Sequence, residues 1–169
     1  MVPAQPPIIG VLAGAWSLLN RTTVYPNGTV VIPIDGLGAN AVGIILYTNT
    51  GYMSMNSMAT EPAYRPTTIT FPYQEGQSDA DWALVGLHTF SYAGPVTNVV
   101  EITPTSGNLT HGPLTFAHVP SLVGSDQNRQ YEVLDDGNIL RLSARVSSGN
   151  TAVLTWQRLA CQGRANPAN

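Results

Sequence analysis

Residues 135–145 read DDGNILRLSAR, and this stretch gives the clearest indication of the fold. The four residues Asp135 to Asn138 are of the types that favour a tight turn. In the segment that follows, from Leu140 to Arg145, apolar and polar side chains alternate strictly. Because successive side chains of a strand point to opposite faces, this pattern predicts a strand with one buried and one solvated face. Such strands are typical of antiparallel sheets.

Similar alternating segments recur along the chain. They lie at residues 42–47, 53–55, 88–93, 114–118 and 152–156. Sixteen glycines and thirteen prolines interrupt the chain between them, which argues against long helices. We therefore expect an all-β protein: a single antiparallel β-barrel of about eight strands, wide enough to hold one small ligand. One short helix is expected over 78–87, with Ser78 as its N-cap.

The length of 169 residues corresponds to one domain. We expect an N-terminal arm at 1–10, the barrel at 11–160 and a C-terminal tail at 161–169. The segment 60–77 contains three prolines and is expected to form a long loop over one mouth of the barrel.

The composition excludes several kinds of function. The sequence contains no lysine, which excludes Schiff-base chemistry and P-loops. Its single cysteine, Cys161, excludes an intrachain disulfide and a cysteine-rich zinc site. The net charge of −3 gives no basic surface for nucleic acid. His111 and His118 are seven residues apart, on opposite faces of any regular strand, so we expect no metal site.

The apolar run from Ile8 to Leu19 is too short to span a bilayer. The residues before it carry no Lys or Arg, unlike the start of a signal peptide. We expect a cytoplasmic protein with no membrane partner, and leave open both homodimer formation and secretion with cleavage near Ala13–Ala15.

Short motifs occur in a characteristic order: Gly14-Ala15-Trp16, Gly43 to Thr48, Gly51-Tyr52-Met53-Ser54, Arg65-Pro66, Tyr92-Ala93-Gly94, a GxxQxR motif at 124–129 and Trp156-Gln157-Arg158. The series resembles the lipocalin-like domain family of bacteria and fungi, although Pro95-Val96 stands where that pattern usually has an aromatic residue. The resemblance implies a barrel with a hydrophobic interior, in which Arg158 stacks on Trp16 at the closed end. It also implies that relatives act in natural-product pathways as cyclases or isomerases.

The candidate catalytic residues are His118, Tyr92, Arg129 and His88. His118 shares a strand face with Leu114 and Phe116, so it is expected to point inward as a neutral base. The alternative is a core histidine bonded to a backbone carbonyl.

Tyr92 and His88 share a face with Phe90. Tyr92 is suited to donate to a carbonyl or enolate oxygen, or else to bond to the backbone. Arg129 suits a ligand carboxylate or enolate, or alternatively an ion pair with Asp79, Asp81 or Glu101. His111 precedes Gly-Pro and is expected in an exposed turn; by parity Tyr47 and Tyr52 are expected on the outer face.

The cavity walls are expected to contain apolar side chains that contact a substrate: Met53, Met55, Trp82, Phe90, Phe116 and Leu142. Together with the candidate catalytic residues, the family resemblance implies a cofactor-independent cyclase or isomerase for a small hydrophobic natural-product intermediate. The alternative is a non-catalytic carrier of hydrophobic small molecules, and a third reading is a secreted structural or surface protein.

Overall fold

The computed structural model describes residues 7–146 and 148–161. Its helices are α1 (Pro7–Leu12) and α2 (Asp79–Leu87), with short 3₁₀ turns at Pro62–Tyr64, Pro120–Leu122 and Asp135–Gly137. Its strands are β1 (Gly14–Val24), β2 (Val30–Val31), β3 (Val42–Tyr47), β4 (Tyr52–Met58), β5 (Thr89–Thr103), β6 (Ser106–His111), β7 (Phe116–Ala117), β8 (Gln127–Leu134), β9 (Ile139–Arg145) and β10 (Thr151–Arg158).

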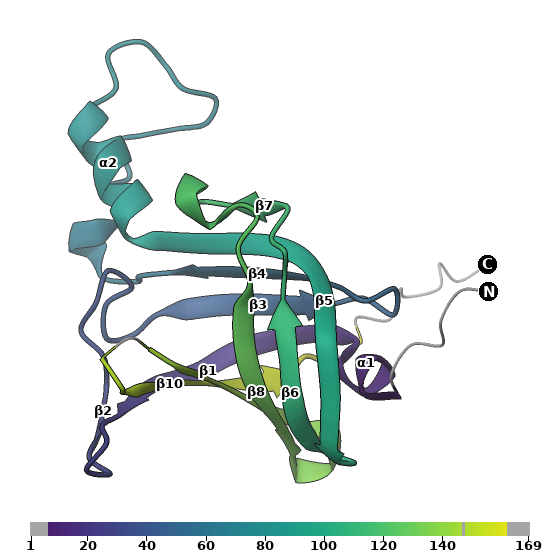
Figure 1. The fold of residues 1–169 in the computed structure, drawn as a ribbon. Coiled ribbons are helices and arrows are strands. Elements are labelled where there is room, and N and C mark those ends of the chain that lie inside the picture. The colour runs from purple at the N-terminus through teal and green to yellow at the C-terminus, as the bar shows by residue number, and fades with distance from the viewer. Residues whose placement is uncertain (1–6, 147, 162–169) are drawn as a thin grey trace, which may run out of the picture.

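Eight of these strands close into an antiparallel barrel (Figure 1). Their order is β10-β9-β8-β6-β5-β4-β3-β1, and β1 pairs with β10 from Trp16–Arg158 to Val24–Thr151. Strands β2 and β7 are additions at the rims, pairing with β1 and β5. The expected barrel is therefore confirmed. Leu140 and Leu142 of strand β9 are buried core residues, as the alternating pattern of this strand predicted.

One end of the barrel is closed by α1 and by the Trp16–Arg158 pair. The guanidinium carbon of Arg158 lies 4.0 Å above the Trp16 ring, and the Trp16 indole N–H donates to Leu12 O at 2.9 Å. Ile8 and Leu12 of α1 are fully buried at this end of the barrel. Because α1 begins at Pro7, the expected boundary at residue 10 falls inside this helix. The arm before residue 7 and the tail after residue 161 lie outside the described residues.

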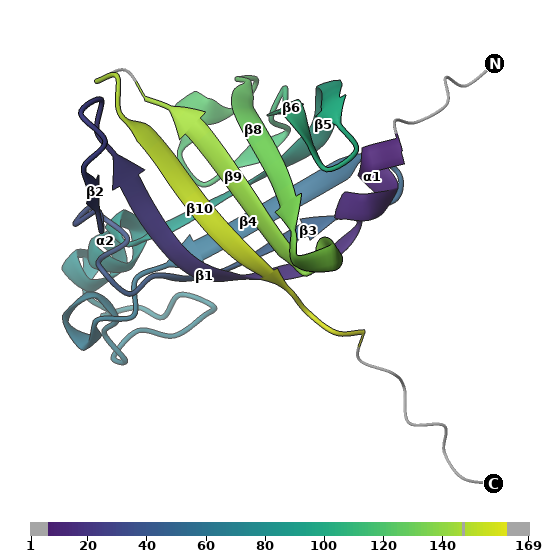
Figure 2. The same ribbon diagram turned by 90° about the horizontal axis from the view of Figure 1, so that it is seen from below.

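The helix α2 projects from the opposite end of the barrel (Figures 1 and 2). It begins as expected: the Ser78 hydroxyl accepts a hydrogen bond from the backbone N–H of Asp81, and Asp79 and Asp81 lie in the first turn. Trp82 donates to the Gln77 side chain at 3.0 Å and packs beside Tyr73, so it stabilises the protruding helix and loop.

The side chains of strand β3 face differently from what parity predicted. In β3, Ile45 and Tyr47 point inward while Val42, Ile44 and Leu46 are exposed, so the prediction of an outward Tyr47 is wrong. The reason is register: β1 pairs Trp16 with Ile45, and both fill the interior. Tyr52 is exposed, as predicted.

The segment around β7 lies at the rim. β7 contains two residues and pairs Phe116 with Ala93 and Ala117 with Tyr92, which turns Phe116 outward. Phe116 is 56 % exposed and His118 is also exposed, although Leu114 is buried. Inward placement of Phe116 and His118 was therefore wrong, because the chain leaves the barrel wall after β6 and strand parity does not carry across the break.

Candidate ligand-binding cavity

The barrel encloses a cavity of about 880 Å³ that opens beside α2. Strands β3, β4, β5, β9 and β10 supply an apolar wall, and the open end is bordered by α2 and by the segment after β7. The apolar wall consists of Ile45, Met55, Phe90, Leu142, Leu154 and Trp156. The polar residues that line the cavity include buried Tyr92 and Ser57 and half-buried Arg129. This arrangement, mostly apolar with few polar groups, is typical of a small-molecule site.

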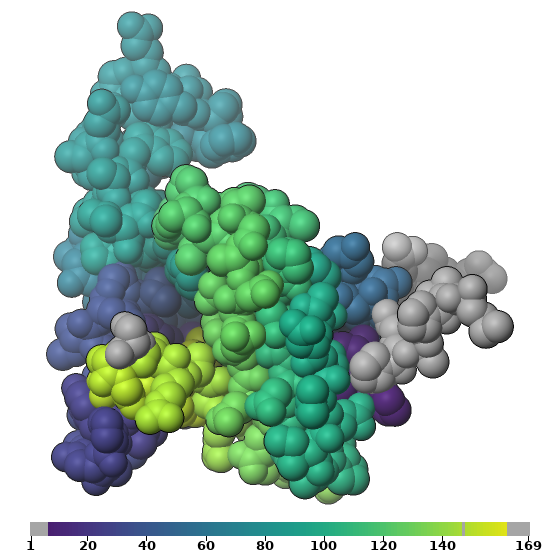
Figure 3. All heavy atoms as spheres, viewed as in Figure 1, coloured from purple at the N-terminus to yellow at the C-terminus, as the bar shows by residue number. Residues whose placement is uncertain are grey.

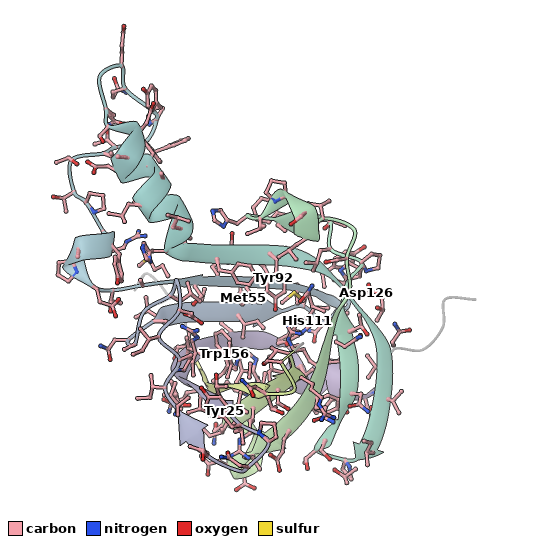
Figure 4. All side chains as sticks on the ribbon, turned by 60° about the vertical axis from the view of Figure 1, so that its left-hand side comes forward. Tyr25, Met55, Tyr92, His111, Asp126 and Trp156 are labelled. Carbon is pink, nitrogen blue, oxygen red and sulfur yellow. The ribbon has the colours of Figure 1, made fainter. Side chains whose placement is uncertain are left out.

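A buried histidine, His111, lies between Tyr47 and Tyr92 beside this cavity. Figure 4 shows His111 next to Tyr92. His111 is 0 % exposed; its Nε2 lies 2.8 Å from the Tyr47 hydroxyl and its Nδ1 lies 3.3 Å from the Tyr92 hydroxyl. The prediction of an exposed turn at His111 is wrong, because β6 extends through His111. The spacing from Leu109 to His111 was the available signal, since it places both residues on one strand face.

The three members of this cluster are neutral near pH 7. Burial lowers the pKa of His111 to about 3, and the nearby Arg129 charge acts in the same direction. Burial raises the pKa of Tyr47 and of Tyr92, against an opposing effect of Arg129. A neutral imidazole has one donor and one acceptor nitrogen, so one tyrosine donates to the ring and the other accepts from it. The accepting tyrosine keeps its own proton for another partner.

Arg129 lies on β8 and lines the cavity close to Tyr92. Its guanidinium donates to the Asn128 carbonyl at 2.8 Å. The ion pairs among the described residues are Arg21–Asp35 and Arg141–Glu132, so none of these residues supplies Arg129 with a carboxylate.

The sequence-based alternative, an ion pair of Arg129 with an acidic residue, is therefore wrong for the described residues. The carboxylates of Glu101 and Asp81 accept from the Ile8 N–H and the Thr68 hydroxyl instead, and Asp79 lies in the first turn of α2.

A second cavity, of about 860 Å³, adjoins Arg129 on its other side. It exists because β8 pairs with β9 only from Gln130–Ser143 to Leu134–Ile139, which leaves the barrel wall open next to Arg129. Its lining is largely polar: Asn98, Asn108, Thr110, Asn128, Gln130, Ser143, Arg145 and Thr151. Figure 3 shows the surface hollowed between β8 and the turn that joins β9 to β10.

The structure brings together six of the predicted site residues. The apolar cavity is lined by Tyr92, Arg129, Met55, Phe90, Leu142 and, at its open end, His118. Their roles in binding or catalysis stay predictions. Sequence reasoning missed Tyr47, His111 and Trp156, of which Trp156 lines the cavity and carries a buried indole N–H without a hydrogen-bond partner among the described residues.

The other predicted residues lie outside this cavity. His88 is outside the cavity, where its ring stacks on Tyr64 at 3.7 Å and its Nδ1 contacts the Gly36 carbonyl oxygen. Met53 is buried in the core without lining the cavity. Trp82 and the loop 60–77 also make no part of the cavity wall, because both extend outward with α2.

The described residues offer no candidate for a metal site or a membrane-spanning helix. No three His, Cys, Asp or Glu side chains within 7–146 and 148–161 come together in a metal-binding group. In the same part of the chain, neither helix has the length and apolar character needed to cross a membrane.

Solved structures with similar folds are distant in sequence. A redesigned β-barrel has 16 % identity and a TM-score of 0.41, covering 94 % of this chain and 100 % of its own. A second redesigned β-barrel, bound to DFHBI, has 16 % identity and a TM-score of 0.38, covering 89 % and 97 %. A fatty acid binding protein of Schistosoma mansoni, in complex with arachidonic acid, has 14 % identity and a TM-score of 0.40, covering 90 % and 98 %.

The comparison with curated proteins gives no match. The comparison with protein families gives one that covers nearly the whole barrel: the lipocalin-like domain matches residues 13–159, from the residue before β1 to the residue after β10. This range contains every strand and every cavity-lining residue described above. The chain therefore belongs to the lipocalin-like domain family.

Proposed function

We propose that this protein binds a small hydrophobic molecule in its apolar cavity. The observation that supports this most is the cavity itself, about 880 Å³ of space walled by apolar side chains and open at one end. A solid core of the same composition would be better packed and more stable, so an open interior favours a binding role. Cytoplasmic location and homodimer formation remain part of the proposal on sequence grounds alone.

Binding is tested with Nile red, a neutral dye whose fluorescence rises in apolar surroundings. Leu154→Trp fills space in the cavity and is expected to weaken dye binding by about tenfold or more. Val153→Trp is the matched control, because Val153 directly precedes Leu154 in β10 and its side chain points to the opposite face of the strand. Equal dye binding by both variants and the wild type would show that the cavity is not the binding site.

A second candidate is cofactor-independent catalysis of a cyclisation or isomerisation, and the position of Tyr92 supports it. Tyr92 lines the cavity, and its hydroxyl contacts neutral His111, which in turn contacts Tyr47. When Tyr92 is the accepting member of this cluster, its own proton is free to polarise a ligand carbonyl. The cavity would hold the reactive conformer in place, which itself lowers the barrier.

Catalysis of this kind conserves molecular formula, which makes it measurable without knowing the substrate. A strain lacking the gene is expected to accumulate an isomer of a metabolite that the wild-type strain contains. Complementation with Tyr92→Phe should leave that isomer in place, whereas Tyr52→Phe, an exposed tyrosine outside the cavity, should remove it. Absence of any such pair of isomers would leave binding as the function.

A further inference from the structure

We propose that the ligand is an amphipathic anion, a hydrophobic carboxylic acid or enolate, whose charged oxygen binds Arg129 where the apolar and polar cavities meet. This inference rests on the proposed function, that the apolar cavity binds a small molecule, and adds the chemical class. Two observations carry it: Arg129 has no carboxylate partner among the described residues, and it lines both the apolar and the polar cavity.

Arg129 lines the apolar cavity and has no carboxylate partner among the described residues. Arg129 carries five N–H donors, and the hydrogen bond found for them ends on the adjacent Asn128 carbonyl. The one acidic side chain in the lining, Asp35, is paired with Arg21 at the open end. A ligand that supplies acceptor oxygen, above all a charged oxygen, is the chemical complement of this lining.

Arg129 is shared by both cavities, and this explains how an anion can enter an apolar barrel. Full burial of a carboxylate is costly, but the polar cavity keeps one side of Arg129 next to amide and hydroxyl groups. An apolar body can then fill the inner cavity while the charged group stays at the opening between β8 and β9. Polar substituents of the ligand would extend into the outer cavity.

The test compares acids with neutral alcohols of the same size. Decanoate and decan-1-ol form one pair, and 4-phenylbutyrate and 4-phenylbutan-1-ol form another, each titrated into the wild-type protein by calorimetry near neutral pH. A charge-assisted hydrogen bond predicts that at least one acid binds about tenfold or more tightly than its alcohol. This comparison needs no variant, so it does not depend on whether a substitution is tolerated.

Variants then assign the effect to Arg129. Arg129→Gln is expected to weaken acid binding about 10- to 100-fold and to leave alcohol binding within about twofold, while Arg129→Lys keeps part of the preference. Arg141→Gln is the matched control: Arg141 lies on β9, pairs with Glu132 and lines neither cavity, so its loss should change the affinity for neither ligand by more than about twofold.

The outcomes separate this inference from the proposed function. Alcohols that bind as tightly as the acids, or an equal loss of acid binding in Arg129→Gln and Arg141→Gln, would overturn the anion site while leaving hydrophobic binding intact. Failure of all four compounds and of Nile red to bind would instead refute the proposed function, and the inference with it.

Discussion

Burial of His111 makes the stability of this protein depend on pH in a predictable way. The pKa of His111 is lowered to about 3 in the folded state by burial, against 6.5 for the free side chain. The unfolded state therefore binds one more proton than the folded state at any pH between these values. The stabilisation is fully present above about pH 6.5 and is lost progressively as the pH falls towards about 3.

The magnitude follows from the size of the shift. Within that window the free energy of unfolding falls by about 1.4 kcal/mol per pH unit, or by about 2 kcal/mol between about pH 7.5 and pH 5. His111→Gln removes the titrating group and retains one donor and one acceptor for the two tyrosines. The stability difference between wild type and His111→Gln should therefore shrink by about 2 kcal/mol over the same range.

The measurement is urea denaturation followed by tryptophan fluorescence at several pH values. His118→Gln is the control, because His118 is exposed at the open end of the cavity and makes no buried contact of this kind. Parallel pH profiles for the wild type and His111→Gln would refute the reasoning. So would an NMR titration in which the His111 ring takes up its proton near neutral pH.

Three further changes test the fold and the tyrosine cluster. Trp16→Ala should lower the free energy of unfolding by roughly 3–5 kcal/mol, since it empties the closed end, and an unchanged urea midpoint would contradict this. Tyr47→Phe keeps the ring but leaves His111 Nε2 without its partner, at a cost of about 1–3 kcal/mol, whereas exposed Tyr52→Phe should be neutral. Ser78→Ala should destabilise α2 by about 1 kcal/mol, seen as faster amide exchange in that helix while the barrel midpoint stays the same.

The parts of the fold that were predictable are those where local chemistry alone determines the structure. Strand β9 alternates apolar and polar residues without exception, so its buried face is unambiguous. The start of α2 was predictable from Ser78 and the two aspartates, because capping depends on side chains within the first turn. The Trp16–Arg158 pair was expected from the family resemblance, and its geometry is confirmed.

The errors occur where partners distant in sequence determine the outcome. Residues 42–47 read VGIILY and contain no charged or strongly polar residue, so nothing local distinguishes their two faces. Pairing with β1 distinguishes the two faces, because it places Ile45 opposite Trp16 in the barrel interior. The segment after β6 was treated as one strand, yet the chain leaves the wall there and only two residues pair again with β5.

The same distinction explains why the site was only half predictable. Tyr92 and Arg129 were identified from their inward parity and chemistry, which the sequence carries. His111 was discarded because the Gly-Pro that follows it resembles a turn, and its importance depends on tyrosines 64 residues before and 19 residues before it. A buried polar cluster of this kind is assembled by the closed barrel, so no window of sequence contains it.

The direction of the Tyr92 hydroxyl proton separates a carrier from a catalyst. A carrier requires Arg129 and the apolar wall, since together they hold an amphipathic anion, and the tyrosines then serve only to keep His111 satisfied. A catalyst requires in addition that the Tyr92 proton point into the cavity rather than at His111. Tyr92→Phe therefore affects the two roles differently: a carrier should keep its affinity for the acid within about threefold, whereas a catalyst should bind equally well and stop converting its ligand.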